Sequence, residues 1–234
     1  MWPAFARALN AVPRAMISEI NNQCPFDIPG LFWREGRFSV SAATTMTTSA
    51  DPLGRIEVVL PDDLISAGPK RRSEFLAGRL CAALALRAAG QPIAVGRNGR
   101  APTWPPGLAG SITHSDCRAI AVVSLTHSAI GVDCETIMPE ALAIRLHAEI
   151  LHPQETELRP DNMPFASFLT VIFSAKEALY KALAQQLETI PDFLDVVLIT
   201  FTSDNLYLVL HGRTMIVHYR MTQTECVTLM VVDG

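Results

Sequence analysis

Short apolar runs alternate with turn-forming residues in the first sixty positions. The runs lie at 31–33, 38–40 and 56–60, and clusters of Gly, Pro, Thr and Ser separate them. Apolar runs of this length, bounded by residues that favour turns, are typical of β-strands. The pattern therefore predicts strands and loops over residues 31–60.

The local residue composition changes at residue 71. Strong helix formers dominate from 71 to 89, and Gly90 and Pro92 follow them closely. Such a run predicts a helix, and Gly followed by Pro is a common helix stop. Residues 96–110 are rich in Gly and Pro and predict an irregular loop.

Two further apolar runs lie at 119–125 and 130–135. Both are too short for typical helices and almost wholly apolar, which predicts two buried strands joined by a turn at 126–129. Helical patterns follow at 140–150 and 173–187. Three prolines interrupt the segment between these two helices.

The C-terminal part holds four apolar runs separated by polar turns, which predicts an antiparallel meander. These runs cover residues 196–202, 206–210, 215–220 and 226–232. A long helix followed by strands thus occurs twice, in residues 71–125 and 173–232. The two segments share a pattern rather than residues, so an internal duplication is a hypothesis. The order of elements favours an α+β fold.

Length and composition narrow the class of protein. A chain of 234 residues is long enough for one large domain or for two small domains that share a core. Apolar residues make up 49% of the chain, which argues against wholesale disorder. The net charge is −4, so binding to nucleic acid through overall charge is not expected.

Cysteine usage and the N-terminal segment bear on the compartment. The five cysteines are odd in number and show no CxxC spacing, so neither a disulfide framework nor a zinc site is indicated. A reducing, cytoplasmic setting is expected. Arg7 and Asn10 interrupt the apolar start, and no apolar run approaches 18 residues. We therefore expect neither a signal peptide nor a membrane span.

Three acidic residues form a candidate metal site. Asp133 and Glu135 are two apart in a predicted strand and share one face, while Glu177 and Lys181 are one turn apart on a predicted helix. Lys176 projects to a neighbouring side of the helix. If that helix packs on the strand, three carboxylates converge beside one or two lysines, a donor set that suits Mg²⁺ or Mn²⁺. The alternative is a solvated strand end and a surface pair of small energetic value.

Basic and small residues form a second candidate site. Arg71 and Arg79 lie on the first predicted helix, and Arg100 lies in the Gly/Pro loop, where Arg97 is an alternative. The run from Gly110 to Ser115 contains Thr113 and His114. Small residues let backbone N–H groups approach a phosphate, and Arg and His supply further donors. A solvated basic helix face is the alternative interpretation.

These segments, taken together and in this order, resemble the 4′-phosphopantetheinyl transferases of the surfactin/enterobactin type, and most of all the enterobactin synthetase component D subgroup. The resemblance covers residues 71 to 185, about half of the chain. Its most specific part is the pair formed by the last two motifs at their mutual spacing. The matching stretches are 71–79, 102–107, 110–115, Gly131-Val132-Asp133-Cys134-Glu135 and Phe173 to Lys181.

The resemblance implies a fold of two pseudo-twofold-related α+β halves with the active site in the cleft between them. The halves would be residues 1–127, with the nucleotide-binding elements, and 128–234, with the metal-binding acids and the carrier-protein docking surface. It assigns Asp133, Glu135 and Glu177 to magnesium and Lys181 to the pyrophosphate. The residues that it assigns to the nucleotide and its 3′-phosphate are Arg71, Arg79, Arg100, Thr113 and His114.

The implied reaction transfers 4′-phosphopantetheine from coenzyme A to a serine of an apo acyl, peptidyl or aryl carrier protein. Glu177 would act as the base, as a metal ligand or as both, and residues 136–172 would contribute to docking of the carrier. A monomer is expected, because the duplication supplies both walls of the cleft. Siderophore or other secondary metabolism is the expected pathway. The alternatives are a metal-dependent phosphohydrolase and a non-catalytic coenzyme-A-binding module.

Overall fold

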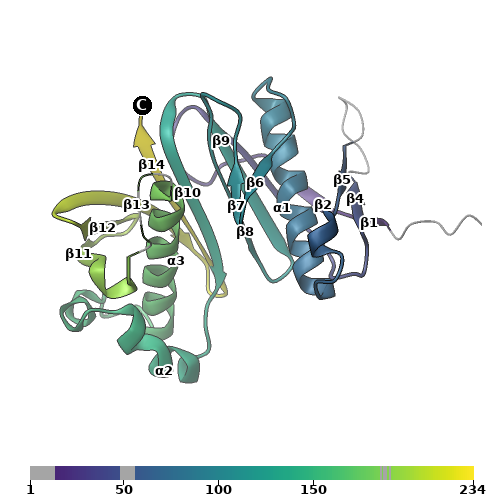
Figure 1. Cartoon of the computed structure of the whole chain (residues 1–234). Coiled ribbons are helices and arrows are strands. Elements are labelled where there is room, and N and C mark those ends of the chain that lie inside the picture. The colour runs from purple at the N-terminus through teal and green to yellow at the C-terminus, as the bar shows by residue number, and fades with distance from the viewer. Residues whose placement is uncertain (1–13, 48–55, 185, 187–188, 190) are drawn as a thin grey trace, which may run out of the picture.

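The computed structural model describes residues 14–47, 56–184, 186, 189 and 191–234. Two α+β halves lie side by side, and each has one long helix packed on a sheet (Figure 1). The first half contains α1, Pro69–Ala88, and the second contains α2, Glu140–Ile150, and α3, Phe165–Leu183. Within the described ranges, none of the helices is both long and apolar enough to cross a membrane.

The sheet of the first half has the strand order β2-β3-β9-β8, and α1 covers one of its faces. Leu76, Leu80 and Cys81 of α1 are fully buried against Ala119 and Ala121 of β9. A three-stranded sheet, β1-β4-β5, and a two-stranded sheet, β6-β7, complete this half. The strands of this half are β1 Arg14–Met16, β2 Ser18–Asn21, β3 Leu31–Arg37, β4 Thr45–Thr47, β5 Glu57–Val59, β6 Gly96–Asn98, β7 Ala101–Thr103, β8 Ala109–Ser115 and β9 Arg118–Ser124.

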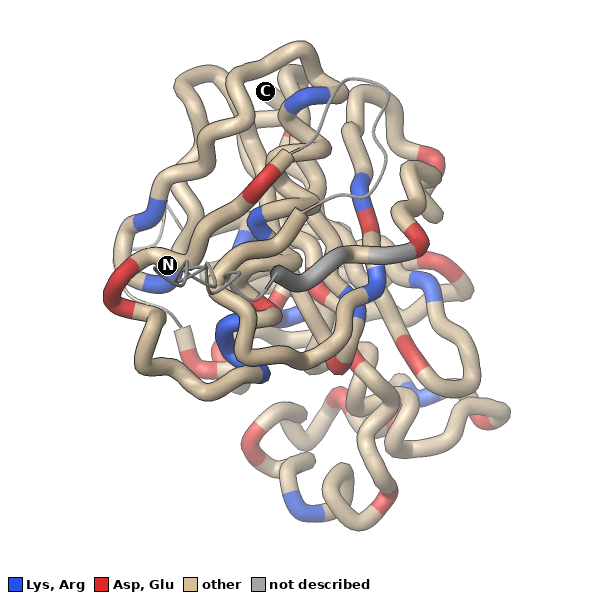
Figure 2. Tube along the Cα trace, turned by 90° about the vertical axis from the view of Figure 1, so that its right-hand side faces the viewer, with Lys and Arg blue, Asp and Glu red and all other residues tan. Residues whose placement is uncertain are grey.

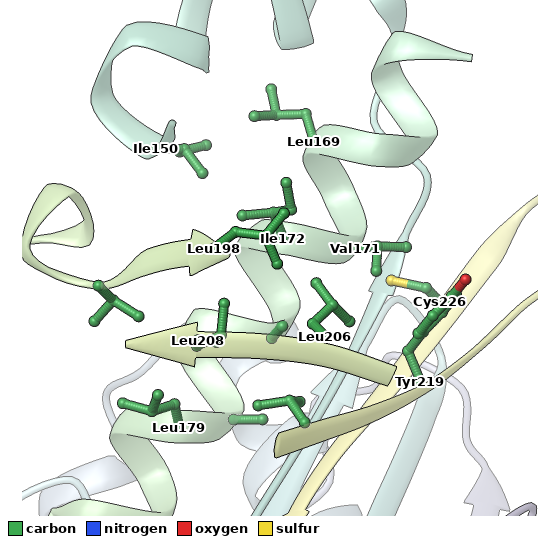
Figure 3. Close-up of a cluster of buried hydrophobic side chains, with 14 of the residues drawn as sticks. Ile150, Leu169, Val171, Ile172, Leu179, Leu198, Leu206, Leu208, Tyr219 and Cys226 are labelled. Atoms are coloured by element: carbon green, nitrogen blue, oxygen red, sulfur yellow. The ribbon is translucent and has the colours of Figure 1, made fainter. Parts of the chain in front are cut away.

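The sheet of the second half has the strand order β10-β14-β13-β12-β11 and is antiparallel throughout. The buried face of α3 packs on it, with Ile172 and Leu179 against Leu198, Leu206 and Leu208 (Figure 3). Its strands are β10 His127–Thr136, β11 Val197–Phe201, β12 Asn205–Leu210, β13 Arg213–Met221 and β14 Glu225–Asp233.

A third apolar cluster joins the two sheets. Trp33 and Ile120 of the first half pack with Val132 and Leu229 of the second, and all four side chains are almost completely buried. The two halves therefore share a core, which holds their facing edges in a fixed relation.

Several predicted elements are confirmed and four differ. The first long helix, the helix at 140–150 and the C-terminal meander all form. The second long helix, however, begins at Phe165 rather than at 173, directly after Pro164. Its first two turns contain Thr170, Val171 and Ile172, whose β-branched side chains are buried and hide the helical period.

The other differences concern loops and strands. The Gly/Pro loop at 96–110 contains the short β6–β7 hairpin and the start of β8. Residues 38–40 lie outside the strands, and β10 already begins at His127, inside the turn predicted at 126–129. The two strands that this turn joins, β9 and β10, pair in different sheets. Sequence pattern reports an extended segment but not its partner strand, which tertiary packing selects.

Candidate active site

Alternating side chains of β8 face two different parts of the molecule. Ser111 and Thr113 are buried toward β10, whereas Ile112 and His114 line a pocket on the α1 side. The period of two in a strand separates these sets. Strand β8 therefore contributes to two regions: one of its faces lines the pocket on the α1 side, and the other lies against β10.

The acidic strand β10 places Asp133 at the centre of a buried hydrogen-bond network. The side chain of Asp133 is 5% exposed. Its Oδ1 accepts hydrogen bonds from Lys181 Nζ at 2.6 Å and from Thr113 Oγ1 at 3.0 Å, and its Oδ2 accepts one from Ser174 Oγ at 2.8 Å. The predicted convergence of β10 with the helix that carries Glu177 and Lys181 is thus present in the structure.

Glu135 and Glu177 lie close enough to Asp133 to be affected by its charge. Burial, reinforced by the charge of Asp133, raises the pKa of Glu135 to about 7, and Lys181 only partly opposes this. Burial also raises the pKa of Glu177 above its ordinary value, with Lys181 opposing and Asp133 adding to the shift. The three acids therefore carry more negative charge than Lys181 neutralises.

Gly131 permits the close approach of α3 to β10. A Cβ atom at this position would lie 1.7 Å from the backbone oxygen of Ala178 and 2.7 Å from the nitrogen of Ala182. Only a residue without a side chain fits between these two backbones. Glycine two positions before Asp133 is therefore a requirement for bringing Glu177 and Lys181 to the strand.

The chemistry of these donors fits Mg²⁺ or Mn²⁺, because carboxylate oxygens are the ligands that hard divalent cations prefer. The excess negative charge fits a cation too. As the side chains stand, no three His, Cys, Asp or Glu groups in the described ranges lie close enough to hold a metal ion. Ligation by all three acids would require Glu135 and Glu177 to turn toward Asp133.

The predicted basic residues surround one pocket of about 440 Å³ between α1, β8 and the β6–β7 hairpin. Arg71, Arg79, Arg100 and His114 all line it, and so does Arg97. Both candidates for the loop arginine are therefore present, and Arg97 also forms an ion pair with Asp63. Elsewhere, acidic and basic positions are interspersed along the trace rather than separated onto two faces (Figure 2).

Arg79 is the most buried arginine of the pocket. It donates to the carbonyl oxygens of Val95 at 2.9 Å and Gly96 at 2.6 Å, and its guanidinium lies 5.2 Å from the centre of the Phe75 ring. Burial lowers its pKa to about 10, with a further contribution from Arg97. These contacts anchor the hairpin to α1, and the guanidinium still carries its charge near neutral pH.

His114 projects from β8 between Arg71 and Glu74. Arg71 NH1 lies 3.4 Å from its Nε2, and Glu74 Oε2 lies 3.8 Å from its Nδ1. A guanidinium only donates, so Nε2 accepts and the ring proton belongs on Nδ1, toward Glu74. Burial lowers the pKa of His114, and Arg71 and Lys181 lower it further against the effect of Glu74. The ring is therefore largely neutral at pH 7.

The side chain of Thr113 does not face this pocket. Its hydroxyl accepts from the backbone N–H of Cys134 at 3.3 Å and donates to Asp133. The nucleotide-binding role expected from the resemblance remains a prediction for Thr113, but its hydroxyl is engaged by the acidic strand. Alternation of Ser111, Thr113 and Ser115 with Ile112 and His114 is the sequence signal that could have separated the two faces.

The sequence did not indicate Ser174, and it placed Lys176 only on a neighbouring side of the helix. Ser174 is fully buried and bonded to Asp133. Lys176 is fully buried as well, and its Nζ donates to Glu155 Oε2 at 3.1 Å and to the carbonyl oxygens of Ile150 and Phe193. Lys176 thus secures α3 to the segments on either side of it and takes no part in the hydrogen bonds to Asp133.

Comparison with known proteins shows the family of this chain. A family model described as the 4′-phosphopantetheinyl transferase N-terminal domain matches residues 60–124, and a model of the 4′-phosphopantetheinyl transferase superfamily matches residues 129–229. The chain belongs to the 4′-phosphopantetheinyl transferase superfamily, and its α+β fold is that of the family.

The relatives of this chain include proteins of the enterobactin synthase component D subgroup. Enterobactin synthase component D of Salmonella typhimurium is 40% identical over 149 residues, which is 63% of this chain and 62% of that protein. The component D protein of Escherichia coli O157:H7 is 37% identical over 166 residues, 70% of this chain and 78% of that protein. The 4′-phosphopantetheinyl transferase Npt of Nocardia iowensis is 40% identical over 119 residues, 48% of this chain and 52% of that protein. The match thus spans less than two thirds of the Salmonella protein.

Proposed function

We propose that this protein transfers 4′-phosphopantetheine from coenzyme A to a serine of an apo carrier protein, with Mg²⁺ as the metal ion. The observation that carries the proposal is the adjacency of a basic pocket and a buried acidic cluster on either side of β8. Coenzyme A needs two such regions side by side, because its nucleotide end needs cations and the reacting end of its pyrophosphate needs a metal and a base.

The basic pocket is the proposed site for the nucleotide end of coenzyme A. Arg71, Arg79 and Arg100 supply donors for phosphate oxygens, His114 lines the same pocket, and the pocket volume of about 440 Å³ lies within the range of small-molecule sites. A neutral His114 with its Nδ1 proton toward Glu74 leaves Arg71 as the main charge beside it.

Asp133, Glu135 and Glu177 are the residues that would hold the metal ion. Bound there, it would supply charge neutralisation at the pyrophosphate and polarise its phosphorus. Lys181 forms an ion pair with Asp133 at 2.6 Å and brings an ammonium group to the site. We infer that, with a metal ion bound beside Asp133, Lys181 would be free to turn to a phosphate oxygen.

Glu177 is the proposed acceptor of the serine proton. Its raised pKa makes the carboxylate a stronger base than an exposed glutamate, which suits removal of a hydroxyl proton as the oxygen attacks. The new bond joins the serine oxygen to the β-phosphorus. The bond from this phosphorus to the bridging oxygen breaks, and adenosine 3′,5′-bisphosphate leaves with that oxygen.

The carrier protein is proposed to dock on the segment between the acidic strand and α3. Of the apolar residues there, Ile150 and Leu151 are buried, whereas Ile144 of α2 is 59% exposed and stands beside the exposed Arg145. An exposed isoleucine next to a cation suits an acidic helical domain. Names of the relatives favour a carrier of siderophore synthesis.

The division into halves at residues 127 and 128, a monomeric state and a cytoplasmic location also remain parts of this proposal. The turn between β9 and β10 separates the two sheets, which supports the boundary. Both walls of the site come from one chain, which supports a monomer.

The test is intact-mass spectrometry of an apo carrier protein incubated with this protein, coenzyme A and Mg²⁺. We expect the carrier to gain one phosphopantetheinyl group, and the gain to be abolished with Glu177→Gln and without Mg²⁺. Binding of coenzyme A without transfer to several unrelated carriers would favour a binding module instead. Hydrolysis of coenzyme A without a carrier adduct would favour a phosphohydrolase.

A further inference from the structure

Three hydroxyl side chains of β8 form a ladder to the backbone of β10. The hydroxyl oxygens of Ser111, Thr113 and Ser115 accept from the backbone N–H groups of Val132 at 3.0 Å, Cys134 at 3.3 Å and Thr136 at 3.3 Å. From one contact to the next, the residue number rises by two on β8 and by two on β10, so these two strands run in the same direction. The ladder joins the edge of the first sheet to the edge of the second without any shared strand pairing.

The middle contact of the ladder carries an additional bond to a carboxylate. The Thr113 hydroxyl accepts from Cys134 and uses its proton to donate to Asp133 Oδ1 at 3.0 Å. The Ser111 hydroxyl, by contrast, meets β10 at the backbone N–H of Val132. Thr113 therefore connects the wall of the basic pocket directly to a carboxylate of the acidic cluster.

A second buried hydroxyl holds the other oxygen of Asp133. Ser174 Oγ donates to Oδ2 at 2.8 Å and lies 2.9 Å from Thr228 Oγ1. An ionised carboxylate only accepts, so the Ser174 proton points to Asp133, and the Thr228 hydroxyl donates its own proton to the backbone oxygen of Ser174 at 2.8 Å. The side chains of Thr113, Ser174 and Thr228 are nearly or completely buried, so water does not replace them.

We propose that Thr113 and Ser174, one from each half, are positioning residues that fix the plane of the Asp133 carboxylate for the metal ion. The inference rests on the proposed function and deepens it. Because one donor comes from β8 and the other from α3, the carboxylate is oriented only when both halves are assembled around β10. Hydrogen bonds of this kind to a ligating carboxylate determine metal affinity.

The direct test measures Mn²⁺ binding by electron paramagnetic resonance, with purified full-length protein and no substrate. We expect Thr113→Val to weaken Mn²⁺ binding by about 10- to 100-fold, the usual effect of removing such a partner. Thr113→Ser restores the hydroxyl and should restore the affinity. Ser111→Ala removes a ladder contact without touching Asp133 and should leave Mn²⁺ affinity unchanged.

A second readout separates positioning from general damage. With Thr113→Val the Mg²⁺ concentration for half-maximal transfer should rise, and with Thr113→Ser it should return to that of the wild type. Ser174→Ala should weaken Mn²⁺ binding in the same way, and it replaces Thr113→Val if that variant does not fold by circular dichroism.

The outcomes distinguish this inference from the proposed function. If the wild type transfers phosphopantetheine and Thr113→Val binds Mn²⁺ as the wild type does, the positioning role is refuted. Equal losses for Ser111→Ala and Thr113→Val would refute it as well, because the ladder alone would then explain them. A wild type that neither binds Mn²⁺ nor transfers the group would instead overturn the proposed function.

Discussion

Two lysines of the Phe173–Lys181 motif have opposite environments although they are five positions apart. Lys176 is completely buried against Glu155, whereas Lys181 is 30% exposed and pairs with Asp133. Burial lowers the pKa of Lys176, and Glu155 opposes that shift. A buried pair tolerates loss of one partner poorly, which assigns Lys176 to the packing of α3 and Lys181 to the site.

His218 provides a test of how burial of one side chain makes stability depend on pH. It lies on β13 with its ring centre 6.3 Å from that of Phe26, and burial lowers its pKa, with Arg220 adding to the shift. A base whose pKa is lowered by folding binds more protons when unfolded, so its contribution to stability is present above about pH 6.5 and is lost at lower pH.

We therefore expect the wild type to lose more stability between pH 7 and pH 5 than His218→Gln does. Urea denaturation at the two pH values measures the difference. His147→Gln, at an exposed position on α2, is the control and should follow the wild type. Equal losses of unfolding free energy in the wild type and in His218→Gln would contradict the prediction.

At the scale of elements, the contact between β10 and α3 controls the geometry of the acidic cluster. Gly131 leaves room for the backbone of α3, and the helix then brings Ser174, Glu177 and Lys181 to Asp133. Neither element alone forms the cluster. A small displacement of the helix would separate the acids that β10 and α3 contribute.

Gly131→Ala should therefore move α3 and reduce both stability and transfer. Its Cβ would meet backbone atoms, which cannot rotate away, so we expect a loss of about 1–3 kcal/mol in the free energy of unfolding, the usual range for overpacking. Urea denaturation and the carrier mass assay measure the two effects.

Gly68→Ala is the matched control, because a Cβ there meets nothing within 4 Å. It should cost less than about 1 kcal/mol as a change at a helix N-cap. If Gly131→Ala changed neither the free energy of unfolding nor transfer, α3 would leave room for a Cβ atom at this position.

At the scale of the whole molecule, ion pairs reinforce the apolar core between the halves. Arg118 of β9 makes a bidentate contact with Glu35 of β3, at 2.7 and 3.0 Å, and reaches Glu225 of β14 at 3.1 Å. The side chains of Arg118 and Glu35 are 14% and 15% exposed. This network therefore crosses from the first sheet to the second near the end of β10 that carries Glu135.

Arg118→Met should destabilise the fold by about 1.5–3 kcal/mol, because it removes the bidentate donor of the Glu35 carboxylate and leaves Glu225 with Arg37 at 3.6 Å. Urea denaturation measures the loss. Lys70→Met, which removes an exposed lysine whose partner Glu74 lies 3.9 Å away, should change stability by less than about 0.5 kcal/mol. Similar values for the two variants would mean that the network contributes little to holding the halves together.

The sequence by itself determined the elements with a clear period or clear end signals. The first helix ends before Gly90, which has φ of +68°, and the meander follows its polar turns. The sequence also proposed the residues of the acidic site. Strand period and helix spacing make Asp133, Glu177 and Lys181 candidates for one site if the helix packs on the strand, and the resemblance assigns them to it.

Only the tertiary structure decided what the remaining side chains do. The start of α3 was hidden because its first turns are buried on most sides and carry no clear amphipathic period. The direction of Thr113, the burial of Lys176 and the bond from Ser174 to Asp133 depend on which strand and helix lie next to each residue. Local sequence fixes a residue's face within its own element, whereas its partner is fixed by packing between elements distant in the chain.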